Sequence, residues 1–305
     1  MNMAKISVVI NTINEAKKLP RTLASLKGFA NEIIVVDMHS TDNSVEIAKE
    51  FGAKVFKHKW LSYVEPARNF GISKTKHEWV LILDPDEELS ESLKLLLRQE
   101  VKKPQADFYR IPRKNIIFNK WMKHSGWWPD YNIRFFKKEK VIWNEVIHSV
   151  PMTIGKGMDF LAKEEFAIKH RHYSSVEDYI LKMNRYTTVQ ARELNKKGIE
   201  FKWRDILIKP ASEFLRRYFA ESGYKDGLHG LVLSLLQVLS ELIVYVKLWQ
   251  KQKFRKRKID AEDTFEELNK IAKDYMWWLF TSKIKDSSNV VSKLWLKIIR
   301  KIKYQ

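Results

Sequence analysis

The chain has 305 residues, of which 45% are hydrophobic and 30% charged, and this composition excludes a disordered tail, a collagen-like fibre and a multi-span membrane channel. It contains no cysteine, which excludes disulfides, thiolate catalysis and cysteine-ligated metal sites. The 56 Lys and Arg residues exceed the 37 Asp and Glu residues, and the net charge of +19 predicts an anionic partner: nucleic acid, anionic lipid or a phosphorylated substrate.

The first hundred residues alternate short apolar runs with amphipathic segments, which is typical of a parallel α/β sheet with crossover helices. The apolar run at 6–10 is too short for the core of a signal peptide, so a cytoplasmic start is expected. The predicted strands are 6–10, 32–37, 53–57 and 79–83. The predicted helices are 15–27, capped by Asn14, then 44–51, and one that opens at Pro66.

Further strands and loops are expected between about Asp107 and Val150, completing the sheet. A helix capped by Ser175 and ended by Gly198 follows, and 228–249 is a nearly apolar helix with basic residues on both flanks. We therefore predict a catalytic domain at 1–173, with a nucleotide half at about 1–100 and an acceptor half at about 101–173, and a helical region at 174–305.

Polar side chains follow three of the predicted strands. Thr12 and Asn14 come after the first, Asp37 after the second, and Asp84 and Asp86 after the fourth. Ligands of open α/β sheets bind outside the carboxyl ends of the strands, so these side chains are expected to converge on one site.

Asp84-Pro85-Asp86 is the strongest local signal, because two carboxylates just outside a strand can hold a hard divalent ion that keeps open positions for diphosphate oxygens. A solvated loop that caps a helix is the alternative. Asp37 is expected to accept hydrogen bonds from a ribose or base, whereas Asp42 is expected to cap the next helix. Neither a dinucleotide fingerprint nor a Walker loop is present, so Arg68 is a candidate for pairing with phosphate.

Four sequence motifs together resemble the successive motifs of family 2 glycosyltransferases. They are Val8-Val9-Ile10-Asn11-Thr12-Ile13-Asn14-Glu15, Val35-Val36-Asp37-Met38-His39-Ser40-Thr41-Asp42, Ala67-Arg68-Asn69-Phe70-Gly71-Ile72 and Leu83-Asp84-Pro85-Asp86-Glu87. The resemblance implies a GT-A fold with a mixed central sheet, and a metal-dependent hexosyltransferase. It also implies that Thr12, Asn14, Glu15, Asp37, Arg68 and Asp84 line the nucleotide-sugar pocket, and that Asp84 and Asp86 bind Mg²⁺ or Mn²⁺.

Later segments are similar to the branch that includes lipopolysaccharide core β-1,4-glucosyltransferases. These segments are 129–136, 143–148, 170–173, 182–188 and 223–227. The resemblance implies an acceptor in the cell envelope, either a glycan or a lipid-linked sugar. Relatives often carry His-Glu where this chain has His148-Ser149, so a base role cannot be transferred from that glutamate.

Inverting sugar transfer needs a general base beside the acceptor hydroxyl and stabilisation of the leaving diphosphate. Asp130 and Glu145 are the two candidate bases, and Asp130 is preferred because Trp127 and Trp128 beside it could stack on a sugar. A structural ion pair is the alternative for each. His148 and His170 are candidates for binding the metal or diphosphate, or for an ordinary structural role.

Gln237 and Glu241 interrupt the apolar helix at 228–249, so it does not meet the rule for an uninterrupted membrane span. Its basic flanks favour an interfacial helix on the inner, anionic face of the cytoplasmic membrane, and packing in a homodimer or against the catalytic domain is the alternative. For the whole chain, a nucleic-acid-binding protein would explain the charge but not the acidic strand ends, and an inactive GT-A scaffold is a third hypothesis.

Overall fold

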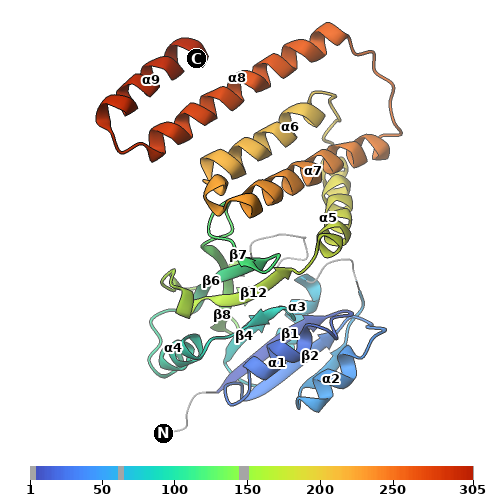
Figure 1. The fold of residues 1–305 in the computed structure, drawn as a ribbon. Helices are drawn as coiled ribbons and strands as arrows, with labels where there is room; N and C mark the ends of the chain where they lie inside the picture. Colours follow the sequence, from blue (N-terminus) through green and yellow to red (C-terminus); the bar gives the residue numbers. More distant parts are fainter. Residues whose placement is uncertain (1–4, 61–64, 144–150, 305) are drawn as a thin grey trace. The chain divides into compact units, whose positions relative to one another are not determined.

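The computed structural model describes residues 5–60, 65–143 and 151–304, and it divides into two compact units. The first unit comprises Met1–Ile116 and Trp128–His172, and the second comprises Ile117–Trp127 and Tyr173–Gln305. Figure 1 shows the sheet in the first unit and the long helices in the second. The predicted mixed α/β domain followed by C-terminal helices is confirmed.

A mixed sheet forms the centre of the first unit, with the strand order β3-β2-β1-β4-β8-β6-β12-β5. β1, β2, β3 and β4 run parallel, and β8 pairs antiparallel with both β4 and β6. The strands are β1 (Ile6–Thr12), β2 (Glu32–Asp37), β3 (Lys54–Lys57), β4 (Trp79–Leu83), β5 (Glu87–Glu88), β6 (Phe108–Ile117), β8 (Asp130–Lys137), β11 (Gly157–Asp159) and β12 (Ile168–Tyr173). A separate pair joins β9 (Val141–Ile142) to β10 (Met152–Thr153).

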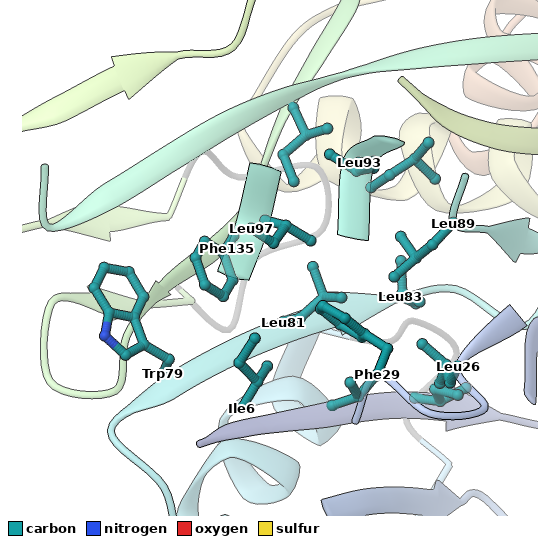
Figure 2. Close-up of a cluster of buried hydrophobic side chains, with 14 of the residues drawn as sticks. Ile6, Leu26, Phe29, Trp79, Leu81, Leu83, Leu89, Leu93, Leu97 and Phe135 are labelled. Carbon is teal, nitrogen blue, oxygen red and sulfur yellow. The ribbon is translucent and has the colours of Figure 1, made fainter. Parts of the chain in front are cut away.

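β1, β2 and β4 are buried on both faces, as their largely apolar sequences predict. One face packs against α1 (Leu19–Ser25), α2 (Ser44–Glu50) and α4 (Glu91–Lys102), in the cluster drawn in Figure 2. The other face packs against α3 (Glu65–Ser73). A short 3-10 turn, η1, lies at Glu164–Phe166.

The approach of α3 to the sheet depends on Gly71. A Cβ at this position would lie 2.5 Å from Val9 Cγ1 and 2.9 Å from Val36 Cγ2, closer than side-chain carbons approach. The missing side chain therefore lets α3 pack directly on β1 and β2, next to the strand ends where the site is expected.

The predicted capping of the first helix is wrong. Asn14 has a positive φ of 53°, and the helix begins only at Leu19, after Lys18, whose side chain makes no cap bond. Asn14 instead forms hydrogen bonds with Ser40 and Thr41 in the loop after β2, and does not cap the helix.

The second unit contains β7 (Lys120–Trp121) and five α-helices among the described residues. The helices are α5 (Val176–Lys196), α6 (Asp205–Phe214), α7 (Leu228–Lys251), α8 (Ala261–Asp286) and α9 (Val290–Tyr304), with a π-helical turn η2 (Leu215–Ala220) and a 3-10 turn η3 (Gly223–Asp226). Ser175 caps α5 as predicted, because its Oγ accepts a hydrogen bond from the Asp178 N–H.

By length and composition alone, α7 is suited to cross a membrane. Its polar side chains, however, bind α5: Gln237 Nε2 donates to the Tyr179 hydroxyl at 2.8 Å, and Lys247 Nζ donates to Asn184 Oδ1 at 2.6 Å. Gln237, one of the two residues that interrupt the apolar sequence, thus has a partner inside this unit, which favours a packing helix.

Stability in acid is expected to depend on Glu32, at the start of β2. Its carboxylate accepts hydrogen bonds from Ser7 Oγ, the Lys76 N–H and Lys54 Nζ. Burial opposes ionisation, but these donors outweigh it and lower the pKa of Glu32 from 4.5 to about 2.

A folded pKa below the unfolded value means that this stabilisation is present above pH 4.5 and disappears as the pH falls towards 2. Glu32→Gln should therefore cost about 3 kcal/mol of unfolding free energy at neutral pH, and little near pH 2. Denaturant titrations across this pH range measure the difference. Glu50→Gln, an exposed change on α2, is the control, and an equal effect of the two changes would contradict the prediction.

Candidate functional site

The loops after β1 and β2 are joined by hydrogen bonds at the carboxyl end of the sheet. Asn14 Oδ1 accepts from the Thr41 N–H at 2.7 Å, and the Asn14 N–H donates to Ser40 Oγ at 2.9 Å. Asp42 Oδ2 accepts from the Ala16 N–H, while its Oδ1 accepts from the Ser44 N–H at the start of α2. Asp42 therefore acts at the helix start, as expected, and also ties the two loops together.

Buried polar groups lie at the ends of β1 and β2. Thr12 and Asp37 are neighbours in the strand register, and the Asp37 carboxylate accepts from the Ser40 N–H at 3.1 Å. Thr12 Oγ1 and both side-chain polar atoms of Asn11 are buried and have no hydrogen-bond partner in the described part of the chain. Buried polar atoms without partners cost about 1–3 kcal/mol each, so this edge is suited to a polar ligand that supplies the partners.

Asp84, the first residue after β4, is held by two guanidinium groups. Arg68 Nη2 lies 3.0 Å from Asp84 Oδ1, and Arg134 Nη2 lies 2.6 Å from Asp84 Oδ2. Burial alone would raise the pKa of Asp84, but Arg134 and Arg68 outweigh it and hold that pKa well below its usual range. Asp84 is thus ionised, and both of its oxygens are engaged by arginines.

A second buried carboxylate shares Arg134. Glu87 is fully buried, and its Oε1 lies 2.6 Å from Arg134 Nη2, while its Oε2 accepts from the Asp84 N–H at 2.9 Å. Burial raises the pKa of Glu87, and the charge of Arg134 opposes that rise. Arg134, only 3% exposed, therefore holds two carboxylates together beneath the loop that contains Asp86.

Asp86 lies opposite a histidine on β12. Asp86 Oδ1 is 3.5 Å from His170 Nε2, and His170 Nδ1 is 2.6 Å from Asn115 Oδ1. Asn115 Nδ2 donates to Asp130 Oδ2, so the amide oxygen faces His170, and Nδ1 must be the nitrogen that donates. The other ring nitrogen, Nε2, lies between Asp86 Oδ1 and His172 Nδ1, which is 3.1 Å away.

The Asp86 and His170 pair fits a hard or borderline divalent ion. Adjacent ligands of an octahedral Mg²⁺ are roughly 3 Å apart, close to the separation of these two atoms, and a ring fixed through its other nitrogen is usual for metal-binding histidines. No group of three or more such ligands gathers among the described residues, so diphosphate oxygens and water would complete the coordination. Of the other two predicted metal ligands, Asp84 has both oxygens paired with Arg68 and Arg134, and His148 lies outside the described residues.

Asp130, the preferred candidate base, is bound on both oxygens. Its Oδ2 accepts from Arg113 Nη2 at 2.6 Å and from Asn115, and its Oδ1 accepts from Asn132. Burial would raise the pKa of Asp130, but Arg113 and the hydrogen bond from Asn115 outweigh burial and lower it. Asp130 is therefore ionised near neutral pH, with its Oδ1 the less occupied oxygen. Glu145, the other candidate base, lies outside the described residues.

The structure brings most of the predicted site residues to one edge of the first unit. Glu15, at the same edge, donates its N–H to Ser44 Oγ and pairs with Lys18. Four further polar residues, which were not predicted as site residues, hold the cluster together: Glu87, Arg113, Asn115 and Arg134. The only sequence signal for them is that Glu87 and Arg134 fall inside motifs quoted for the family resemblance.

Comparisons with known proteins identify the family of this chain. The model of the family "Glycosyl transferase family 2" matches residues 7–160. A Rickettsia typhi protein, described only as an uncharacterized glycosyltransferase, is 31% identical over 273 residues, which cover 86% of this chain and 92% of the relative.

Solved structures resemble the chain only weakly. S. aureus TarS 1–349 in complex with UDP-GlcNAc has a TM-score of 0.44 and 15% identity, covering 84% of this chain and 94% of that one. Glucosyl-3-phosphoglycerate synthase from Mycobacterium tuberculosis, in complex with Mn²⁺, UDP and its glucosylated product, has a TM-score of 0.40 and 15% identity, covering 65% and 81%. The family model and the Rickettsia relative, over most of both chains, establish that this chain belongs to glycosyl transferase family 2.

Proposed function

We propose that this glycosyltransferase moves a hexose, with inversion, from a nucleotide-diphosphate sugar to a cell-envelope acceptor, either a glycan or a lipid-linked sugar similar to a lipopolysaccharide core. The observation that carries the proposal is the unsatisfied polar edge at the ends of β1 and β2, beside the Asp86 and His170 pair. The first feature is suited to a nucleoside and the second to the metal-bound diphosphate of the same donor.

The residues have separate roles in this proposal. Thr12, Asn14, Glu15 and Asp37 line the nucleoside pocket, with Asp37 accepting from ribose or base. Arg68, which pairs with Asp84, would also pair through its guanidinium with phosphate oxygens of the donor. Asp86 and His170 would hold Mg²⁺ or Mn²⁺, with His148 as a further ligand. The ion, when bound, would neutralise charge on the leaving diphosphate.

Asp130 is the proposed general base, and Glu145 is the alternative. An inverting transfer requires the base to take the proton of the acceptor hydroxyl as that oxygen attacks the anomeric carbon. Asp130 is already ionised because of Arg113, and its Oδ1 has one amide partner that an acceptor hydroxyl could join or displace. Its lowered pKa makes it a weak base, so proton transfer is expected late, when the hydroxyl has become more acidic.

A thermal-shift screen tests the donor site directly. UDP, GDP, ADP, CMP and dTDP are each added with and without Mn²⁺, with inorganic phosphate as the control. A nucleotide at a hundredfold excess over its Kd should stabilise the native state by roughly 3 kcal/mol, and only when Mn²⁺ is present.

The outcomes separate the three functional hypotheses. Stabilisation by one nucleoside diphosphate in the presence of metal supports the transferase hypothesis and identifies the nucleobase of the sugar donor. The same stabilisation without turnover on any envelope acceptor would favour an inactive scaffold. Stabilisation by oligonucleotides alone, weakening steeply with salt, would contradict the proposal and favour nucleic-acid binding.

A further inference from the structure

The C-terminal helix α9 (Val290–Tyr304) carries an uncovered apolar stripe. Its members recur at spacings of three or four residues, which places them on one face of a helix. They are Val291, Leu294, Trp295, Ile298 and Ile302, and they are 76%, 61%, 62%, 50% and 77% exposed. Five large apolar side chains in one row are more than scattered surface residues and mark an interaction surface.

The opposite side of α9 is fixed to α8 (Ala261–Asp286). The Arg300 guanidinium lies 4.1 Å from the centre of the Trp277 ring, and its Nη1 donates to Thr281 Oγ1 at 2.7 Å. Ser292 and Leu296, on this side, are partly buried. Because α8 already occupies that side, the exposed stripe cannot be covered by the same neighbour.

The polar residues of α9 are strongly basic. The helix contains Lys293, Lys297, Arg300, Lys301 and Lys303 and no acidic residue. Lys297 and Lys301 are exposed and lie one helical turn apart, along one border of the apolar stripe. The second unit as a whole has 29 basic and 16 acidic residues, an excess of 13 that accounts for most of the charge of the chain.

We propose that α9 binds an anionic lipid bilayer, lying in the interface with its apolar stripe among the acyl chains. An apolar row with a central Trp, bordered by lysines that reach the headgroups, is the pattern of interfacial helices. Each lysine near an anionic surface strengthens the binding. This inference does not depend on the proposed sugar transfer, since it concerns a surface and not the candidate site.

Charge argues against the two other occupants of this stripe. A second copy of the chain would bring another α9 with five positive and no negative side chains, so two stripes in contact would repel each other. A nucleic acid would satisfy the lysines but would leave the five apolar side chains in water. An anionic leaflet alone complements both the charge and the apolar row.

Co-sedimentation of the full chain with vesicles tests the proposal. The vesicles contain phosphatidylcholine alone or with a one-third share of phosphatidylglycerol, and the test variant is Leu294→Glu with Ile298→Glu. The matched control is Leu95→Glu with Leu181→Glu, which makes the same charge change at leucines that are 63% and 71% exposed on α4 and α5. Thermal unfolding of each variant verifies that it is folded.

The unchanged protein should bind the anionic vesicles, weakly bind the neutral ones, and lose affinity as salt rises. The α9 variant should lose about tenfold or more in partition coefficient, whereas the control should stay within about twofold. Lys297→Gln with Lys301→Gln should reduce the preference for anionic lipid while keeping residual binding to neutral vesicles.

Three results would overturn the proposal. One is an equal loss of vesicle binding in the α9 variant and its control, which would show that the change in net charge alone causes the loss. Another is the absence of anionic-vesicle binding by the unchanged protein. The third is a dimer, measured by light scattering, that the α9 variant converts to a monomer with vesicle binding unchanged, which would assign the stripe to a second copy.

Discussion

Asp86→Ala is expected to lower turnover by roughly a thousandfold or more while leaving the fold intact, because a bound metal ion contributes several kcal/mol of transition-state stabilisation. Asp86 provides the carboxylate that lies 3.5 Å from His170 Nε2. Its backbone carbonyl, which accepts from the Arg171 N–H, is unaffected by the change, so the pairing of β5 with β12 should survive. Turnover is measured at increasing Mn²⁺ concentrations.

Asp86→Asn keeps the shape of the side chain but removes its charge, and should show an intermediate loss that high Mn²⁺ partly restores. Asp159→Ala is the matched control, because Asp159 pairs with Arg110 on the exposed side of the same unit. Full activity of Asp86→Ala at low Mn²⁺ would refute the metal assignment. If the unfolding midpoint of Asp86→Ala falls so far that the protein is unfolded under the assay conditions, the loss of activity would show a structural role instead.

Arg134→Met is expected to destabilise the protein by about 3–5 kcal/mol, since it leaves two carboxylates without their shared partner in a buried setting. Arg134 Nη2 lies 2.6 Å from both Asp84 Oδ2 and Glu87 Oε1, and Glu87 is fully buried. Denaturant unfolding measures the change. Arg110→Met, which breaks an exposed ion pair with Asp159, should cost no more than about 1 kcal/mol.

The stability that Arg134→Met loses should depend on pH in a definite direction. Burial raises the pKa of Glu87, and removal of Arg134 raises it further. An acid whose folded pKa exceeds its unfolded value costs stability at high pH, and this cost falls as the pH approaches the unfolded value of 4.5. The stability deficit of Arg134→Met should therefore shrink as the pH falls towards 4.5, and adding Glu87→Gln should recover part of it at neutral pH. A deficit that grows on acidification would contradict this account.

The strands of the sheet could be predicted because their signal is local. The runs at 32–37 and 79–83 match β2 and β4 residue for residue, since a parallel strand buried on both faces has a nearly continuous apolar sequence. The start of α1 could not be predicted in the same way. Asn14 is a favourable capping residue, but its side chain is bound by Thr41 on the next loop, a partner 27 residues away in sequence.

The acidic residues at the strand ends could be predicted from the sequence, whereas the arginines that neutralise them could not. Asp84 and Asp86 follow directly from the end of an apolar strand. Arg113 and Arg134 lie on antiparallel strands that join the sheet later, and only the β8 pairings with β4 and β6 bring them to the same edge. A single sequence contains no signal for such register, so the pairing of Asp130 with Arg113 emerges only in three dimensions.

The second unit is assembled from two separate stretches of chain, and this has a consequence for synthesis on the ribosome. Ile117 and Met122 are fully buried against Tyr179 and Leu233, and Lys120 Nζ donates to the Asp226 carbonyl, 106 residues later. The segment 117–127 is therefore synthesised well before the helices that cover it. Its apolar side chains are exposed to water until those helices have been synthesised and have folded. In a chain that ends after residue 172, the apolar side chains of 117–127 would stay exposed. Such a fragment should therefore aggregate unless 117–127 is also replaced by a short polar turn.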